Sequence, residues 1–349
     1  MKALTRADRR RRRGPTIYEV AKRAGVSIAT VSRVQQQPSR VAAPTRNRVE
    51  RAIEELAYRP SRLGRSLAHG SHDATGIVFP DLSGPYYSAV ILGYEEASAA
   101  QGQSVLILAT HRRPRSVDQV LHLADRVDGL VIMGRTVDDA VVEQLDRLGV
   151  PMVLLARPPV TAIDSIRSEN RRSAEELVRH LIGHGHDRIA FVGDPAESAD
   201  VAERWDGFLA AHRAAGIQPA FEPTPSALRE GDGRAAAASL LARADPPTAV
   251  VGANDEVALG VLDAARSAGI RLPAGLAVTG WDDIPMTRHV APALTTVRQP
   301  MFDLGRRAAA LLHERITVDP AEPRHETLPT KLVVRSSCGC AAPAEQKEE

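Results

Sequence analysis

The chain has 349 residues, which is too long for one ordinary domain, and 43% of them are hydrophobic, as in globular proteins. No run of about 18 apolar residues is present, so the sequence excludes a membrane-spanning helix. The charged N-terminus lacks the apolar stretch of a secretory signal, and we therefore expect a cytoplasmic protein.

The net charge of +2 conceals two oppositely charged parts. Residues 1–70 contain 17 lysines and arginines against 5 acidic residues, whereas residues 71–349 contain 28 against 38. A basic head on an acidic body predicts that the head binds a polyanion, and nucleic acid is the first choice. An anionic membrane surface is the alternative, but the head lacks a basic amphipathic helix with Trp or Phe on its apolar face.

Residues 1–15 are expected to form a disordered basic arm that attracts phosphates without sequence preference. Three short helices follow over residues 17–24, 28–36 and 44–57. Thr16 and Ser27 are placed to cap the first two, and Gly25 to end the first. Apolar side chains recur in all three at helical spacing, which predicts one small core. Its expected members are Val20, Ala21, Ala24, Val31, Val34, Val49, Ile53 and Leu56.

The second of these helices carries the residue types that reading DNA requires. Arg33 can pair with guanine in the major groove, while Ile28 and Ala29 can contact thymine methyl groups. Three hydroxyl side chains suit phosphate oxygens, and these are Ser27, Thr30 and Ser32. The alternative is a solvated surface helix, which for any one of these residues alone is the better interpretation.

The stretches TIYEVAKRAGVSIATVSRV and PTRNRVERAIEELAYRPSRLGRSLA closely resemble the DNA-binding headpiece of LacI-family transcription regulators. The resemblance implies a helix-turn-helix headpiece over residues 16–60 in which Ile28, Ala29 and Arg33 read bases and Arg40 adds a contact. It also implies phosphate contacts by Thr16, Tyr18, Ser27, Thr30, Ser32, Gln36, Thr45 and Tyr58. Two positions depart from the family pattern: Ala42 replaces a capping Ser, and Gln36 replaces Asn.

Residues 61–73 resemble the family's hinge, which folds as a helix only on operator DNA. By this resemblance Leu67 wedges into the minor groove at the operator centre and kinks the DNA. Packing of Leu67 against the body is the alternative. Gly64 stands where Ala is common and makes the hinge helix harder to form.

From residue 74 onward, short apolar runs alternate with helical patterns, which favours parallel sheets covered by helices. Seven runs predict strands: TGIVFP, SVLILAT, GLVIMG, PMVLLA, RIAFVG, AVVGAN and LAVTGW. Ligands of such sheets bind at the carboxyl ends of the strands. Polar residues follow the runs there, namely Asp81, Arg157, Asp194, Asn254, Asp255, Asp282 and Asp283.

Segments such as HLIGHGHDRIAFVGD and VTGWDDIPMTRHVAPALTTVRQP also resemble the LacI family, whose body is similar to a periplasmic sugar-binding protein. The resemblance implies an α/β body over residues 74–340 with two parallel-sheet subdomains. Their expected boundaries are 74–167 plus 299–328 and 168–298 plus 329–340, followed by a tail over 341–349. An effector would lie between them and contact Tyr86, Tyr87, Arg204, Asn254, Asp282 and Gln299.

Two positions of the body depart from the family pattern. Ala156 replaces an Asp that sugar-responsive members use on a ligand hydroxyl, and Gly233 stands where an aromatic stacking residue is common. Tyr87 or Trp281 would then supply the stacking. Cys338 and Cys340 are too close for an ordinary disulfide and too few for a zinc site, so we expect both in a solvated tail.

The predicted protein is a transcription regulator, expected to be a repressor, that binds a pseudo-palindromic operator as a homodimer or as a tetramer built from it. Its effector is expected to be a small molecule of the carbohydrate class. The alternatives are a sugar-acting α/β enzyme, for which no nucleophile-base pair or metal motif is present, and a transport-binding protein, which would need a signal peptide. We expect neither a cofactor nor a metal.

Overall fold

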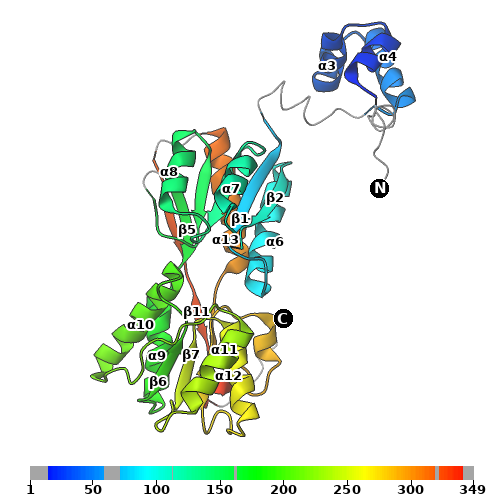
Figure 1. Cartoon of the computed structure of the whole chain (residues 1–349). Coiled ribbons are helices and arrows are strands. Elements are labelled where there is room, and N and C mark those ends of the chain that lie inside the picture. Colours follow the sequence, from blue (N-terminus) through cyan, green and yellow to red (C-terminus); the bar gives the residue numbers. More distant parts are fainter. Residues whose placement is uncertain (1–14, 59–70, 112, 161–162, 319–321, 341–349) are drawn as a thin grey trace. The chain divides into compact units, whose positions relative to one another are not determined.

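The computed structural model describes residues 15–58, 71–111, 113–160, 163–318 and 322–340 (Figure 1). The chain divides into two compact units, Met1–His72 and Asp73–Glu349, which we call the head and the body. Residues 1–14 of the expected basic arm, residues 61–70 of the expected hinge with Leu67, and the tail over 341–349 lie outside the described residues.

The head is built from the helices α2 (Ile17–Ala24), α3 (Ile28–Gln36) and α4 (Ala43–Glu55), with a 3-10 turn η1 (Pro38–Arg40) between the last two. Gly25 ends α2 in the left-handed conformation, which costs glycine little because it has no Cβ. The apolar stripes of the three helices meet in one cluster, as predicted. Val20, Val31 and Val49 are completely buried there, one from each helix.

The body contains a six-stranded parallel sheet in the order β10-β5-β4-β3-β1-β2 and a three-stranded parallel sheet in the order β6-β7-β8. The strands of the first are β1 (Ala74–Phe79), β2 (Ser104–Ala109), β3 (Leu130–Met133), β4 (Met152–Leu155), β5 (Asp164–Ser168) and β10 (His325–Leu328). Those of the second are β6 (Ile189–Val192), β7 (Ala249–Gly252) and β8 (Ala277–Thr279). A short antiparallel pair joins β9 (Thr296–Arg298) to β11 (Lys331–Val333).

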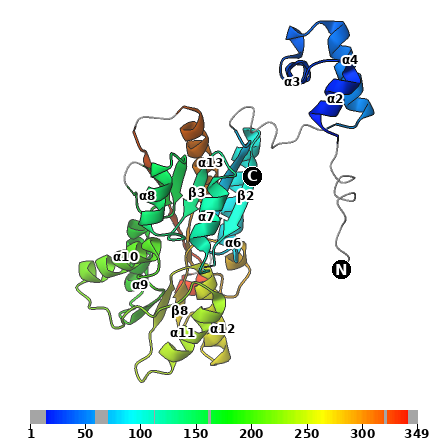
Figure 2. The same cartoon turned by 45° about the horizontal axis from the view of Figure 1, so that its top comes forward.

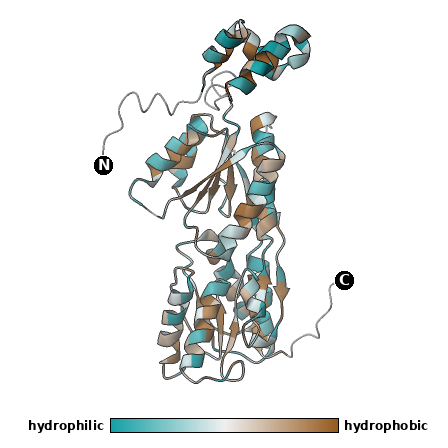
Figure 3. Cartoon of the chain, turned by 90° about the vertical axis from the view of Figure 1, so that its right-hand side faces the viewer, coloured by the Kyte–Doolittle hydropathy of each residue, from teal (hydrophilic) through white to brown (hydrophobic). Residues whose placement is uncertain are grey.

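Helices cover both faces of each sheet, which gives the body two three-layered lobes (Figures 1 and 2). In the six-stranded lobe, α6 (Pro85–Ala100) and α13 (Met301–Thr317) pack on one face, and α7 (Ser116–Ala124) and α8 (Asp139–Arg147) on the other. In the three-stranded lobe, α9 (Arg171–Gly183) and α10 (Ala199–Ala215) face α11 (Glu230–Leu241) and α12 (Asp255–Ser267) across the sheet. The strands are hydrophobic along their length, while the covering helices carry both polar and apolar residues (Figure 3).

The chain passes between the lobes three times. It leaves the six-stranded lobe after β5, returns between β9 and α13, and crosses again between β10 and β11 before it reaches the 3-10 turn η3 (Ser336–Cys338) beside α9. Each lobe is therefore completed by segments that are distant in sequence.

All seven predicted strands are confirmed, but four further strands were not predicted: β5, β9, β10 and β11. The expectation of a solvated cysteine tail was wrong. Cys338 is 1% exposed and belongs to the core of the three-stranded lobe, against which Cys340 is partly buried. The segment is drawn into that core because β11 pairs with β9 and carries the chain end to α9.

Candidate functional site

The exposed face of α3 is the candidate DNA-reading surface of the head. Val31 and Val34 point into the core, so Ala29 and Arg33 lie on the opposite side of the helix and Ile28 lies at its flank, and all three are exposed. Ile28 is 38% exposed although it is apolar. Exposed apolar side chains and an exposed guanidinium on the same helix are the combination that contacts thymine methyl groups and guanine edges.

Two of the predicted phosphate-contacting residues also form the starts of helices. Ser27 Oγ accepts a hydrogen bond of 3.1 Å from the Thr30 amide and lies 2.8 Å from Thr30 Oγ1. The Thr16 amide donates to the Glu19 carboxylate at 2.6 Å. These contacts fix the amide-rich helix starts, where anions bind most readily.

The remaining predicted head residues divide by exposure. Tyr18 is 69% exposed and Arg40 is exposed on η1, whereas Thr45 and Ser32 are half-buried. Tyr58 lies in the head core, where its ring closes the cluster behind α4, and burial raises the pKa of its hydroxyl. The ring therefore belongs to the core, and the predicted phosphate contact of the hydroxyl stays a prediction. The side chain of Gln36 and the whole of Leu67 are outside the described residues.

A cavity of about 830 Å³ opens at the carboxyl ends of the strands of both sheets of the body. All six residues predicted to bind an effector line it: Tyr86, Tyr87, Arg204, Asn254, Asp282 and Gln299. Of the polar residues that follow the strands, Asp81, Arg157, Asp194, Asn254 and Asp282 also line it. Asp255 and Asp283 do not. Asp255 accepts hydrogen bonds from Thr296 and Ile284, and Asp283 forms ion pairs with Arg298 and Arg335.

Arg204 is held rigidly at the cavity wall by α10 and its neighbours. Its Nε donates to Asn170 Oδ1 at 2.9 Å, and its Nη1 donates to the Ala253 carbonyl at 2.6 Å. Its guanidinium lies 4.5 Å from the centre of the Trp281 ring, an attractive cation–π contact. Trp281 is 1% exposed beneath this arginine and does not line the cavity, so the expectation that it stacks on a ligand was wrong.

Asp282 and Gln299 form a buried polar pair on the cavity wall. Gln299 Nε2 donates to Asp282 Oδ1 at 2.6 Å, and Gln299 Oε1 is buried without a hydrogen-bond partner among the described residues. Asp282 has a φ of 121°, a conformation that costs a non-glycine residue energy and aims its carboxyl into the cavity. Burial raises the pKa of Asp282 well above its usual range, although Arg204 opposes this.

In Asn254, both polar atoms of the side chain form hydrogen bonds with the protein backbone. Its Oδ1 accepts from the Val257 amide at 2.9 Å as the cap of α12, and its Nδ2 donates to the Leu228 carbonyl at 3.0 Å. Tyr86 and Tyr87 lie together at the start of α6 with ring centres 5.5 Å apart and planes nearly perpendicular. They supply the aromatic part of the wall.

Two functional groups of the cavity were not predicted from the sequence. Asp200, in the first turn of α10, accepts from Asn170 Nδ2 at 3.1 Å, and burial raises its pKa to about 6. Its position four residues before Arg204 would have placed both on one face of a helix. At the mouth, Arg229 donates to Asp81 at 2.6 Å and joins the two lobes across the cavity.

The two departures from the family pattern lie in different environments. Ala156 lines the cavity, so a carboxylate is indeed missing from that part of the wall. Gly233 lies instead where α11 touches α12, and a Cβ there would overlap the backbone of Val257. The expected loss of a stacking ring at Gly233 is therefore wrong, because the site is a helix contact that admits only glycine.

Two family models match the chain. Residues 16–61 match the lacI family of bacterial regulatory proteins, and residues 178–338 match a periplasmic binding protein-like domain. The HTH-type transcriptional repressor CytR of Escherichia coli strain K12 is 32% identical over 331 residues, which covers 92% of this chain and 96% of that protein. The HTH-type transcriptional regulator CelR of Thermobifida fusca is 35% identical over 342 residues, with 94% and 99% covered.

Solved structures give the same result. The Lac repressor dimer bound to operator and the anti-inducer ONPF is similar with a TM-score of 0.82 and 29% identity, covering 93% of this chain and 99% of that chain. A complex of CelR with cellobiose is similar with a TM-score of 0.70 and 32% identity, with the same shares covered. Among the described residues, none of the helices has the length and apolar character needed to cross a membrane. The chain belongs to the LacI family: it is a DNA-binding transcription regulator, and not an enzyme, with a helix-turn-helix headpiece and a periplasmic-binding-protein-like effector domain.

Proposed function

We propose that this regulator represses transcription as a homodimer on a pseudo-palindromic operator, and that a hydroxylated ligand of the sugar class in the cavity controls its hold on DNA. The observation that carries the ligand assignment is the wall formed by Asp282, Gln299 and Arg204, which presents fixed polar groups from buried positions. Gln299 Oε1 is a buried acceptor that a ligand hydroxyl would satisfy. The volume of the cavity lies within the range of small-molecule sites.

Relatives support the choice of a sugar. CelR has been solved with cellobiose, and a LacI-family regulator of Enterococcus faecium, 29% identical with a TM-score of 0.70, has been solved with ribose. Tyr86 and Tyr87 give the cavity an aromatic surface suited to the apolar face of a sugar ring. The missing carboxylate at Ala156 argues for a ligand with one fewer anchored hydroxyl on that side.

For the head, we assign base contacts to Ile28, Ala29 and Arg33, with Arg40 at the edge of the same surface. Thr16, Tyr18, Ser27, Thr30, Ser32, Thr45 and Tyr58 would lie along phosphates. Two heads related by two-fold symmetry require an operator of two inverted half-sites. Leu67 and Gln36 keep the operator-centre and phosphate roles that the family resemblance implies.

A ligand shifts the regulator only by binding one arrangement of the lobes more tightly than another. The Asp81–Arg229 ion pair joins the lobes at the cavity mouth, so it is a contact whose strength depends on that arrangement. We place the switch at this ion pair. Ligand groups that bridge the two sheets favour one spacing of the lobes, and that spacing determines whether the hinge segments are ordered.

The assignment is tested in two stages. Selection of bound DNA from a random pool gives the operator, and a screen of sugars for a change in binding gives the effector. Asp282→Asn and Gln299→Met should then weaken the effector response by roughly ten- to a hundredfold, the effect of losing a buried charged or polar hydrogen bond worth about 1.5–3 kcal/mol. Operator affinity without effector should stay nearly unchanged, because neither residue is in the head.

Asp263→Asn is the matched control, since Asp263 is an exposed carboxylate on α12 outside the cavity. It should respond to the effector as the wild type does. Wild-type responses in both cavity variants would show that the ligand binds elsewhere, and loss of operator binding in all three would point to misfolding of the body.

A further inference from the structure

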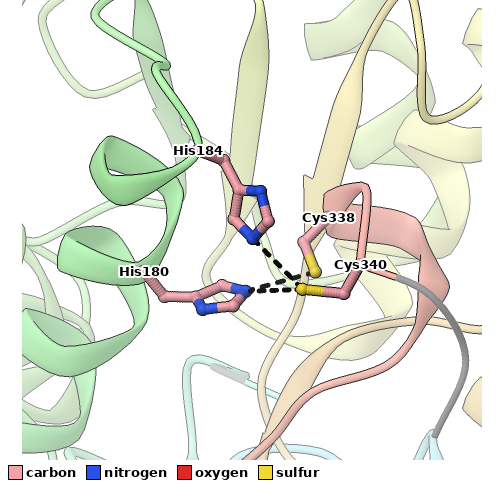
Figure 4. Close-up of side chains that lie close together, drawn as sticks. All are labelled: His180, His184, Cys338 and Cys340. Carbon is pink, nitrogen blue, oxygen red and sulfur yellow. Dashed lines mark hydrogen bonds between the residues drawn. The ribbon is translucent and has the colours of Figure 1, made fainter.

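Four metal-ligating side chains meet on the outer face of the three-stranded lobe, outside the effector cavity. His180 lies in the last turn of α9 and His184 directly follows that helix, four residues on, so both project from the same side. Cys338 and Cys340 come from the chain end, where Gly339 turns the backbone at a φ of +95°. Figure 4 shows both imidazoles directed at the two sulfur atoms.

The distances between the four ligand atoms are close to those between the ligands of one small ion. His180 Nε2 lies 3.3 Å from Cys338 Sγ and 3.6 Å from Cys340 Sγ, and His184 Nε2 lies 3.1 Å from Cys340 Sγ. All four ligand atoms lie within 4.8 Å of one another. Zinc bonds of about 2.3 Å to sulfur and about 2.0–2.1 Å to nitrogen separate tetrahedral ligands by roughly 3.3–3.8 Å.

The surroundings close the cluster on one side and leave it open on the other. Cys338 is buried and its sulfur accepts a hydrogen bond of 3.2 Å from Thr295 Oγ1, as an outer partner of a metal-bound thiolate would donate. His184 is exposed, so an ion can enter from solvent. Both cysteines are free thiols. They are only two positions apart in the sequence, which is too close for an ordinary disulfide between them.

We propose that His180, His184, Cys338 and Cys340 bind one zinc ion in a closed tetrahedral site that ties the chain end to α9. Two thiols lose their protons to solvent as Zn²⁺ binds, and two neutral imidazoles complete the shell, so the occupied site is electrically neutral. Four protein ligands leave no position for water or substrate, which makes the site structural. The ion would anchor the third crossing between the lobes, independently of what the cavity binds.

The test uses the untagged full-length chain, reduced and then stripped with a chelator. Titration with zinc chloride should load one zinc per chain, release two protons, block both thiols from a thiol reagent and raise the melting temperature. Cobalt in place of zinc should give the visible spectrum of a tetrahedral thiolate site. An unchanged melting temperature with two freely reactive thiols, or recovery of a Cys338–Cys340 disulfide from the reduced chain, would overturn the proposal.

Two variants and one control make the assignment specific. His184→Gln and Cys340→Ser change the less buried ligands. Loss of a group that only hydrogen-bonds to a metal ligand lowers metal affinity by roughly 10- to 100-fold, so loss of a ligand itself should lower zinc affinity by more than that. His186→Gln is the control, because His186 is nearby in the chain but its Nδ1 lies 3.1 Å from Thr248 Oγ1 instead. Wild-type affinity in the two ligand variants would refute the site, as would equal loss in the control.

Discussion

Several residues of the cavity wall are fixed by the protein in conformations that they would not adopt in water. Arg204 gives two of its donors to protein acceptors, and Asp282 keeps a strained backbone beside Gln299. Such a wall is preorganised, so a ligand that fits it does not have to order these side chains when it binds. Holding these groups in place lowers the stability of the ligand-free body. At Asp200 this loss of stability depends on pH and can therefore be measured.

Asp200 makes the body less stable as pH rises. The pKa of Asp200 is about 6 in the folded chain, against the ordinary 3.8 of an aspartate, so the folded chain holds this proton more tightly. The free energy of unfolding is therefore larger below about pH 4 and falls as pH rises to about 6, by at most about 3 kcal/mol from this group. Asp200→Asn should remove that part of the slope in urea unfolding measured from pH 4 to 7. Identical slopes for both proteins would show that Asp200 is ionised normally.

Arg33 is expected to read one base pair in each half-site. Arg33→Ala should lower operator affinity by about 1–3 kcal/mol per contact and relax the preference at that pair alone. Competition between operator variants, each changed at one position, measures this. A loss that is equal on all sequences would make Arg33 a phosphate contact.

At the scale of elements, the sequence predicted those helices and strands whose formation depends on neighbouring residues. It did not predict those that depend on residues distant in sequence. The head helices and seven strands were predicted because periodicity and apolar runs are properties of neighbouring residues. Strand β5, which begins at Asp164, was missed because four of the five residues in its sequence DSIRS are polar. That carboxylate is completely buried, and it is stable there because Arg315 and Arg324, more than 150 residues away in sequence, pair with it.

In the candidate site, too, the predictions failed where a residue's role depends on contacts distant in sequence. The six cavity residues were identified by family resemblance, whereas the misassigned ones depend on distant packing. Trp281 lies under Arg204, and Cys338 meets a histidine 158 positions away. None of these neighbours is visible in the sequence around the residue itself.

Helix α4 begins without a side-chain cap, as the sequence predicted at Ala42. The backbone at Ala42 is already extended, with φ of −55° and ψ of 136°, so a serine there can accept a hydrogen bond from the first turn. Ala42→Ser should raise the free energy of unfolding of the head by about 1 kcal/mol. Thermal melting followed by helical circular dichroism on the full chain, in which the head transition is compared with that of the wild type, measures the gain. Equal melting of the serine variant and the alanine wild type would mean that no cap forms.

At the scale of the whole molecule, positive charge is concentrated in the first 70 residues and negative charge in the rest. Operator affinity should therefore fall steeply with salt, because each phosphate neutralised contributes about −0.9 to the slope of log affinity against log salt. We expect a slope of several units for the dimer, measured by DNA binding at increasing potassium chloride. A nearly flat response would contradict binding through the basic head.

The three crossings between the lobes also determine how such a gene can be rearranged. A fragment ending after Ser168 would encode a lobe without α13 and β10, leaving β5 an open edge and part of one face of its sheet uncovered. One recombination event in the body therefore cannot exchange a complete lobe, since three matched junctions are needed. The head ends at a single connection near His72, so one event suffices to give the same sensor a new operator.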